Sequence, residues 1–328
     1  QNYIATHVIL EFKISIMGKF NKFIEEQVAW VSNWKTDAKR PGILAPFAKL
    51  PKLLDRMQAS MVLTEKSSYI QEASTAYLKI ALVLFQLLEH VSLANPKYAN
   101  VIKMENCYFF KHTISQRDIP ALQEYINQAS QIFEVSCQEY LDWLIQCQFP
   151  HVIAFFSRIE DLVASVGPHD VIYHENRKSL DGMLKKYLDE KSVPEGLKLI
   201  NSRMEKHLCN ESALAPVLWD HLSDMMFALF SRYEELCNIC YNVKLNPSAS
   251  QVRYITAQYG GQKGRALAKM ISESTIDNGE AGSFGNFSSP LRGDSSQTSS
   301  RRYLNRSQFS SIIGTGGDNG HNHSGGSS

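Results

Sequence analysis

The hydrophobic positions of this chain recur every three or four residues over long stretches, which is the period of one face of an α-helix. The clearest stretch runs from residue 118 to residue 166 and breaks once, at Pro150. Its apolar or small residues are Leu122, Tyr125, Ile126, Ala129, Ile132, Phe133, Cys137, Tyr140, Leu141, Leu144 and Ile145, then Val152, Ile153, Phe155, Phe156, Ile159, Leu162 and Val163. Stripes this wide predict two helices buried against neighbours, because helix propensity alone rarely sustains such segments in water.

The same period appears on both sides of this stretch. It predicts further helices over residues 8–31, 47–61, 67–91, 98–112, 170–188, 194–209 and 214–243, although the period alone does not assign residues 106–110. No alternating strand pattern, Asn-Gly hairpin or repeat period accompanies them. The sequence therefore predicts an all-α fold.

The composition changes near Asn246-Pro247. Beyond this point Ser, Gly and Asn dominate, and hydrophobic residues are too sparse to offset the entropy of ordering the chain. We expect a disordered Ser/Gly/Asn-rich tail over residues 247–328. The helices before it are expected to form two bundles, over residues 1–117 and 118–246.

The charge balance excludes a strong general attraction to polyanions. The chain has 34 Lys plus Arg against 33 Asp plus Glu, a net charge of +1, so we expect no nucleic-acid partner.

The six cysteines of the chain lie mostly within helical patterns and indicate reduced core residues of a cytosolic protein. The longest apolar run, residues 80–88, is shorter than the roughly 20 residues of a membrane span, so no transmembrane helix is expected. Because the chain begins at Gln1 within a helical pattern, we take it to be part of a longer protein.

Candidate chemical motifs are weak. The Cys237–Cys240 pair has the spacing of a redox or half-zinc motif but lies within a long helical pattern without a second pair nearby, so we interpret it as packing. His169 and His174 lack a metal-ligand context and are interpreted as solvated. The run 260–265 lacks the Gly-Lys-Ser/Thr of a phosphate loop. We therefore predict no catalytic, metal-binding or cofactor-binding residues, and no enzyme activity.

One basic cluster is a candidate contact for anionic lipid or an acidic partner. It consists of Lys35, Lys39, Arg40, Lys49, Lys52 and Arg56. Trp30, Trp34 and Phe47 lie beside it in the sequence, while Asp37 and Asp55 dilute its charge. Charge runs usually form a solvated face, so we favour a solvated face beside core aromatic residues over a binding site.

Several short strings resemble, in their order along the chain, the C-terminal helical region of exocyst complex component one, the Sec-three subunit of the vesicle-tethering exocyst. They are Phe23-Ile24-Glu25-Glu26-Gln27-Val28, Pro46-Phe47-Ala48-Lys49-Leu50-Pro51-Lys52-Leu53-Leu54-Asp55-Arg56, Met104-Glu105-Asn106-Cys107-Tyr108-Phe109-Phe110, residues 140–163, Leu184-Lys185-Lys186-Tyr187, Met204-Glu205-Lys206-His207, Trp219 and Tyr233-Glu234-Glu235-Leu236 through Cys240-Tyr241. The resemblance covers roughly residues 8–245, and its specificity lies in the ordered series.

This resemblance implies an elongated rod of stacked antiparallel helical bundles, of the type found in multisubunit tethering complexes. It implies a non-catalytic exocyst subunit fragment that scaffolds the tethering of secretory vesicles to the plasma membrane before fusion. Other exocyst subunits would be its partners, and it would be cytoplasmic and recruited to sites of exocytosis. The family's contacts with small GTPases and phosphoinositide membrane belong to an upstream domain and map to no residue of this chain. The alternative is a peripheral membrane module that binds anionic lipid through residues 35–56.

Overall fold

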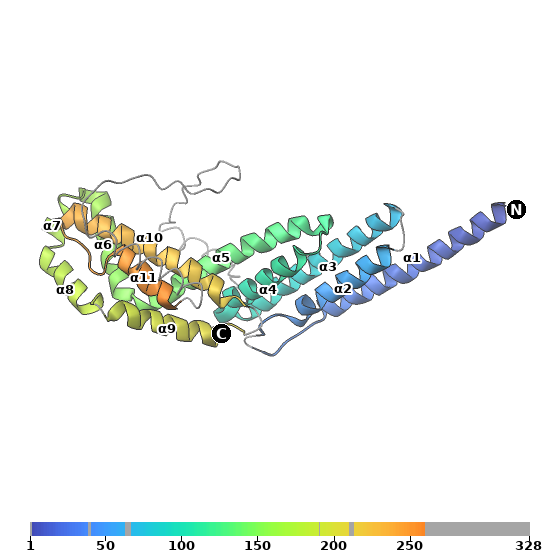
Figure 1. Ribbon diagram of the computed structural model, residues 1–328, viewed down its shortest axis with the longest axis horizontal. Coiled ribbons are helices and arrows are strands. Elements are labelled where there is room, and N and C mark those ends of the chain that lie inside the picture. Colours follow the sequence, from blue (N-terminus) through green and yellow to red (C-terminus); the bar gives the residue numbers. More distant parts are fainter. Residues whose placement is uncertain (1, 39–40, 63–66, 190, 210–212, 260–328) are drawn as a thin grey trace, which may run out of the picture. The chain divides into compact units, whose positions relative to one another are not determined.

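The computed structural model describes residues 2–38, 41–62, 67–189, 191–209 and 213–259, and these are helical with short connections (Figure 1). The α-helices are α1 (Asn2–Ser32), α2 (Ala45–Val62), α3 (Ser67–Ala94), α4 (Ala99–Ile114), α5 (Gln123–Gln148), α6 (Pro150–Val166), α7 (Val171–His174), α8 (Arg177–Tyr187), α9 (Ser192–His207), α10 (Ala215–Tyr241) and α11 (Ala249–Tyr259). Two short 3-10 helices, η1 (Pro96–Tyr98) and η2 (Pro120–Leu122), precede α4 and α5. Across these ranges there is no strand, and the predicted all-α fold is confirmed.

Helices α1 to α5 pack around α3. Helix α3 contacts α1, α2 and α4, and α4 packs along α5. The aromatic centre of this group is formed by Phe47, Phe85 and Phe110, whose ring centroids lie 5.2–6.3 Å apart. Edge-to-face and tilted contacts of this kind add to the stabilisation from burial itself.

Helices α6 to α11 form a second group, in which α8 packs on α6. Helix α10 contacts α6, α7 and α11, while α9 lies against α11 and α5. The Phe156 ring of α6 stacks on the Tyr233 ring of α10, with centroids 3.9 Å apart and planes at 10°. Because α5 also contacts α6, α9 and α10, its packing joins the two groups of helices, and the buried hydrophobic side chains form one continuous cluster.

Most predicted helices are confirmed, and one is divided. The sequence predicted a single helix over residues 170–188, but α7 ends at His174 and α8 begins at Arg177. Asn176 adopts an extended conformation and its side chain accepts a hydrogen bond of 3.0 Å from the Ser179 N–H. The single-helix prediction is wrong because an asparagine N-cap stabilises a new helix start within an otherwise continuous apolar pattern.

The start of the predicted tail also needs correction. Residues 249–259 were expected to be disordered, but they form α11, in which Val252 and Thr256 are buried. The short apolar stripe of α11 packs on α10 and α9, and this tertiary burial outweighs the polar composition around it. Residues 260–328 of the predicted tail lie outside the described residues. The predicted division at residues 117/118 stays a prediction.

Helix α3 contains a segment, Ile70–Ala94, that is long and apolar enough to cross a membrane by length and composition. We had expected no such segment from the length of the uninterrupted apolar run. More than half of the most apolar part is buried inside the protein, including Ile80, Leu84 and Leu88, and α1, α2 and α4 all pack on this helix. This burial is typical of the core helix of a bundle.

Two neighbouring buried polar residues on α4 hold the connections between helices. Asn106 is fully buried; its Oδ1 accepts a hydrogen bond of 2.8 Å from the Leu44 N–H, and its Nδ2 donates one of 3.0 Å to the Gly42 carbonyl. Glu105 is 2% exposed, and its Oε1 accepts a hydrogen bond of 2.6 Å from the Cys209 N–H. The α1–α2 connection and the chain following α9 are therefore anchored on the same turn of α4.

Candidate functional site

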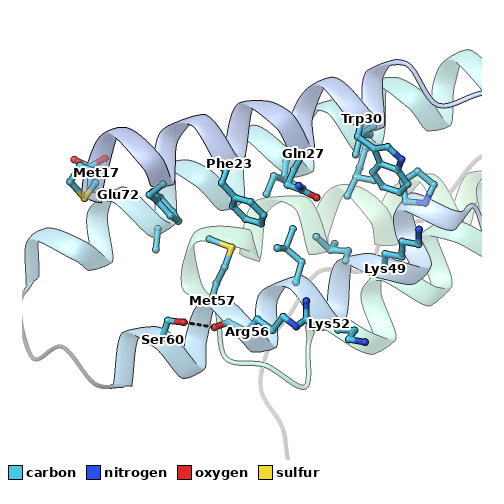
Figure 2. A pocket seen from close by; sticks show the side chains of 18 of the residues that line it. Met17, Phe23, Gln27, Trp30, Lys49, Lys52, Arg56, Met57, Ser60 and Glu72 are labelled. Atoms are coloured by element: carbon cyan, nitrogen blue, oxygen red, sulfur yellow. Dashed lines mark hydrogen bonds between the residues drawn. The ribbon is translucent and has the colours of Figure 1, made fainter. Parts of the chain in front are cut away.

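A groove of about 1010 Å³ lies between α1 and α2, and we call it the α1–α2 groove (Figure 2). Phe20, Phe23 and Trp30 of α1 form one wall, Leu53 and Met57 of α2 form the other, and Ile80 of α3 contributes to the floor. Phe23 and Met57 point toward each other across it in Figure 2. The groove exists because α1 and α2 each pack on α3.

The apolar residues of α1 explain why its wall of the groove is open. Ile24 and Val31 are buried, whereas Phe23 is 41% exposed and Trp30 is 39% exposed. Hydrophobic residues therefore occupy more of the α1 surface than one neighbouring helix covers, and exposed aromatic side chains of this kind are typical of interaction surfaces. The N-terminal half of α1 has the same character, with Ile4 and Phe12 both exposed.

Half of the predicted basic cluster lies along this groove. Lys49, Lys52 and Arg56 are exposed, follow one another at three- and four-residue spacing on α2, and line the groove. The Lys49 Nζ lies 4.8 Å from the centroid of the Trp30 ring, and this cation–π contact joins the α1 and α2 walls of the groove. Lys35 is exposed in the α1–α2 connection and is not among the lining residues. Lys39 and Arg40 lie outside the described residues.

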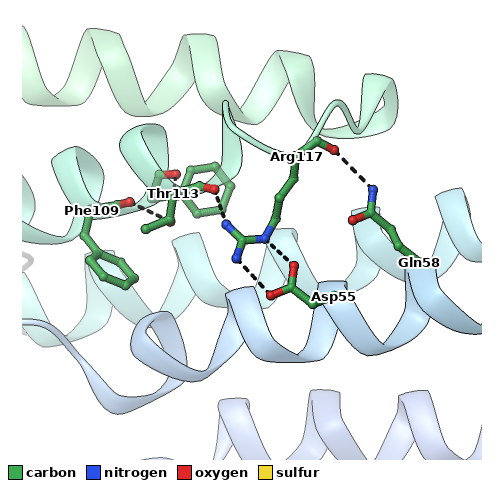
Figure 3. A network of polar contacts seen from close by, with 6 residues as sticks. Asp55, Gln58, Phe109, Thr113 and Arg117 are labelled. Atoms are coloured by element: carbon green, nitrogen blue, oxygen red, sulfur yellow. Dashed lines mark hydrogen bonds and ion pairs between the residues drawn. The ribbon is translucent and has the colours of Figure 1, made fainter.

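Helix α2 is held from its opposite side by Arg117, which follows α4 (Figure 3). The Arg117 guanidinium binds both Asp55 carboxylate oxygens, at 2.7 and 3.0 Å, and also donates to the Thr113 carbonyl. The Gln58 amide donates a hydrogen bond of 3.1 Å to the Arg117 carbonyl. The hydrogen bond from Arg117 holds the pKa of Asp55 below its ordinary value.

This pairing changes the electrostatics expected from the sequence. We had expected Asp55 to dilute the basic cluster, but its charge is balanced by Arg117. Across the described ranges, none of the ion pairs involves Lys49, Lys52 or Arg56. The α2 edge of the groove therefore presents three cations, and Glu72 of α3 lies among its lining residues.

Sequence reasoning identified the three cations but missed the apolar groove beside them. Phe20, Phe23, Leu53 and Met57 were assigned no role, or only helical packing. One signal was present in the sequence: the hydrophobic residues of α1 exceed a single stripe, as Phe23 and Trp30 show. Whether a neighbouring helix covers the apolar face of α1 that carries Phe23 and Trp30 depends on the spacing between α1 and α2. No short-range pattern in the sequence indicates that spacing.

The structure places the two cysteine candidates in the core and the two histidine candidates at the surface. Cys237 and Cys240 are free and buried in α10, and burial raises the pKa of the Cys237 thiol to about 12. A thiol with so high a pKa is a poor nucleophile and a poor metal ligand at neutral pH, as expected for a packing residue. His169 and His174 are exposed. No group of three or more His, Cys, Asp or Glu side chains suited to a metal ion occurs in the part of the chain that the structure describes.

Comparisons with known proteins extend the resemblance found in the sequence. The family model described as "Exocyst complex component Sec3, C-terminal" matches residues 1–243. Exocyst complex component 1 of Dictyostelium discoideum is 24% identical over 253 residues, which cover 76% of this chain and 29% of the relative. Exocyst complex component SEC3A of Arabidopsis thaliana is 24% identical over 257 residues, 76% of this chain and 27% of the relative. Exocyst complex component 1 of Mus musculus is 24% identical over 232 residues, 70% of this chain and 26% of the relative.

The matched region thus spans less than a third of the length of these curated relatives. No solved structure matches the chain.

Proposed function

The chain belongs to the family of the C-terminal region of exocyst complex component Sec3, and from this membership we propose that it is a non-catalytic scaffold segment of an exocyst subunit. Its role is to help assemble the complex that tethers secretory vesicles to the plasma membrane before fusion. Its partners are other exocyst subunits, and it acts in the cytoplasm at sites of exocytosis. The observation that carries this proposal is the extent of the family match, which spans residues 1–243 and includes every helix from α1 to α10.

The structure supports a geometric mechanism. Long helices such as α10, with 27 residues, extend about 40 Å at the usual rise per residue. The continuous buried cluster keeps neighbouring helices in fixed register, since close-packed interiors resist deformation. Surfaces on different helices are therefore held at constant separations, which is what a scaffold needs in order to position several partners.

The lipid-binding alternative receives no support from the comparisons, because each reported relative is named as an exocyst component. The net charge of +1 also provides no general attraction to anionic membrane. A contact between the basic cluster and lipid stays a prediction from the sequence.

Affinity purification of the tagged chain from cells tests the proposed function. We expect enrichment of other exocyst subunits relative to a parallel purification with the tag alone. Circular dichroism and a cooperative thermal transition would verify that the purified chain is folded. Recovery of a folded chain without any other exocyst subunit would overturn the proposal.

A further inference from the structure

We propose that the α1–α2 groove is the docking site for an amphipathic α-helix of another exocyst subunit, with acidic residues along the edge that faces α2. This inference rests on the proposed function and deepens it by naming a surface and the chemistry of its partner. Three observations carry it: the shape of the groove, the nature of its walls and the order of charges along its edge.

The shape suits a helix. The lining residues of α1 extend from Ile16 to Val31, about 23 Å at the usual helical rise, which corresponds to about four helical turns. Helix α2 runs back along α1, and both rest on α3, so the groove is bordered by two antiparallel helices over a third (Figure 2). A helix placed there would lie beside three others, as in a four-helix bundle.

The walls provide the apolar contacts that such a helix needs. Phe23 and Trp30 are large and partly exposed, and Met57 of α2 points toward Phe23 (Figure 2). Aromatic residues and methionine are enriched at the centres of protein interfaces, and a flexible methionine adapts to different side-chain shapes. Helix-in-groove recognition uses anchors at i, i+3 or i+4, and i+7 of the partner, and apolar residues at those positions would face these walls.

The charges select an acidic partner. Lys49, Lys52 and Arg56 lie within eight consecutive residues of α2, a length of about 10 Å, along one edge of the groove. A partner helix with Asp or Glu at the same spacing would bring an opposite charge near each cation. A single lipid headgroup instead requires cations clustered at one end of an apolar pocket. The three cations here lie in a row along the edge of the groove. Glu72 of α3 disfavours a further acid beside it.

Photo-crosslinking tests the occupant directly. Phe23→p-benzoylphenylalanine is introduced into the tagged chain in cells, the associated exocyst subunits are purified after irradiation, and crosslinked peptides are identified by mass spectrometry. The expected product joins position 23 to a segment of another exocyst subunit with apolar residues at helical spacing and Asp or Glu beside them. The matched control is Tyr173→p-benzoylphenylalanine on α7, at a position that is 83% exposed and outside the groove lining; it should not capture this segment.

Charge reversal tests the acidic edge. In the position-23 variant, Lys52→Glu together with Arg56→Glu should lower the crosslink yield to that segment by about tenfold, because attraction becomes repulsion. Lys178→Glu together with Lys198→Glu makes the same change in net charge at exposed positions on α8 and α9, and should leave the yield unchanged. Thermal melts should show that both double variants remain folded, since all four side chains are exposed.

The outcomes separate this inference from the proposed function. If the wild-type chain recovers exocyst subunits but position 23 crosslinks only to lipid, to a second copy of this chain, to a segment without the acidic amphipathic pattern, or to nothing, the docking inference is wrong and the scaffold proposal stands. An unchanged yield after reversal of Lys52 and Arg56 would overturn the acidic edge. If no exocyst subunit is recovered at all, both are wrong.

Discussion

The backbone N–H of Leu44 donates a hydrogen bond of 2.8 Å to the side chain of Asn106, a residue 62 positions later in the chain. The Asn106 amide also donates to the Gly42 carbonyl and, within α4, to the Ile102 carbonyl. One side chain thus satisfies two backbone groups of the α1–α2 connection and fixes where α2 begins.

Asn106→Ala should therefore lower the free energy of unfolding by about 2–3 kcal/mol, because it leaves buried backbone groups without hydrogen-bond partners. Urea unfolding of the purified chain measures this change. Asn127→Ala is the matched control. Asn127 is exposed on α5, where its side chain accepts a hydrogen bond from the Gln123 side chain, so we expect the free energy of unfolding to change by no more than about 0.5 kcal/mol. Equal effects of the two substitutions would contradict the anchoring role of Asn106.

Replacing two helical glycines by alanine should change the stability of the protein in opposite directions. A Cβ at Gly196 in α9 would lie 2.5 Å from the nearest atom of the Phe149 ring, which is buried, whereas a Cβ at Gly182 in α8 meets nothing within 4 Å. Gly182→Ala should stabilise the protein by about 0.5–1 kcal/mol through helix propensity. Gly196→Ala gains the same propensity, but the overpacking costs about 1–3 kcal/mol, so we expect a net loss. Urea midpoints of both variants measure the difference, and a stabilising Gly196→Ala would show that Phe149 moves aside freely.

The pairing of Asp55 with Arg117 predicts a dependence of stability on pH. Because the hydrogen bond from Arg117 lowers the pKa of Asp55 in the folded state, the contribution of the pair is complete above the ordinary Asp pKa of about 3.9 and is lost as the pH falls through the folded value. Asp55→Asn should therefore lower the urea midpoint at pH 7 more than at pH 3. Asp37→Asn, at an exposed position of the α1–α2 connection, controls for the removal of one negative charge. A deficit of Asp55→Asn that is as large at pH 3 as at pH 7 would show that the ion pair does not stabilise the fold.

Truncations locate the end of the packed chain. Removing residues 272–328 should leave the thermal transition nearly unchanged, as their sparse hydrophobic content predicts. Ending the chain at residue 246 also removes α11, whose Tyr259 ring stacks on Trp219 and whose Tyr259 hydroxyl donates to the Pro194 carbonyl. We expect this shorter chain to melt about 5–10 °C lower, because several buried side chains lose their cover. Differential scanning calorimetry of the three lengths measures both effects, and a large loss on removing only 272–328 would contradict the first expectation.

The sequence predicted most helices because each carries an apolar stripe that its neighbours bury, as Phe156 and Ile159 show on α6. It did not predict the end of α7, because the Asn176 cap interrupts an apolar pattern that continues on both sides. It also missed α11, because that helix is short and its burial depends on α10 and α9 rather than on a wide stripe of its own.

The candidate site was predictable only in part, for a similar reason. The spacing of Lys49, Lys52 and Arg56 is local, so the sequence indicates a common helix face. The partner of Asp55 is Arg117, 62 residues away, and the open space beside Phe23 results from how α1 and α2 rest on α3. Pairings and gaps of this kind arise from tertiary structure, and a single sequence contains no short-range pattern for them.

The anchoring of two connections on Glu105 and Asn106 also imposes an order in time on folding. The most extensive packing joins helices that follow each other in the chain, α4 with α5 and α10 with α11. The hydrogen bonds to Leu44 and Cys209 instead close loops of 62 and 104 residues, and the entropic cost of closing a loop grows with its length. During synthesis the start of α2 cannot acquire its final hydrogen bonds until α4 has emerged, and Glu105 must wait until residue 209 has been made. We expect helices to form early and these two connections to form late, first at Leu44 and then at Cys209, so the helix that carries Lys49, Lys52 and Arg56 acquires its fixed beginning before the chain following α9 is anchored.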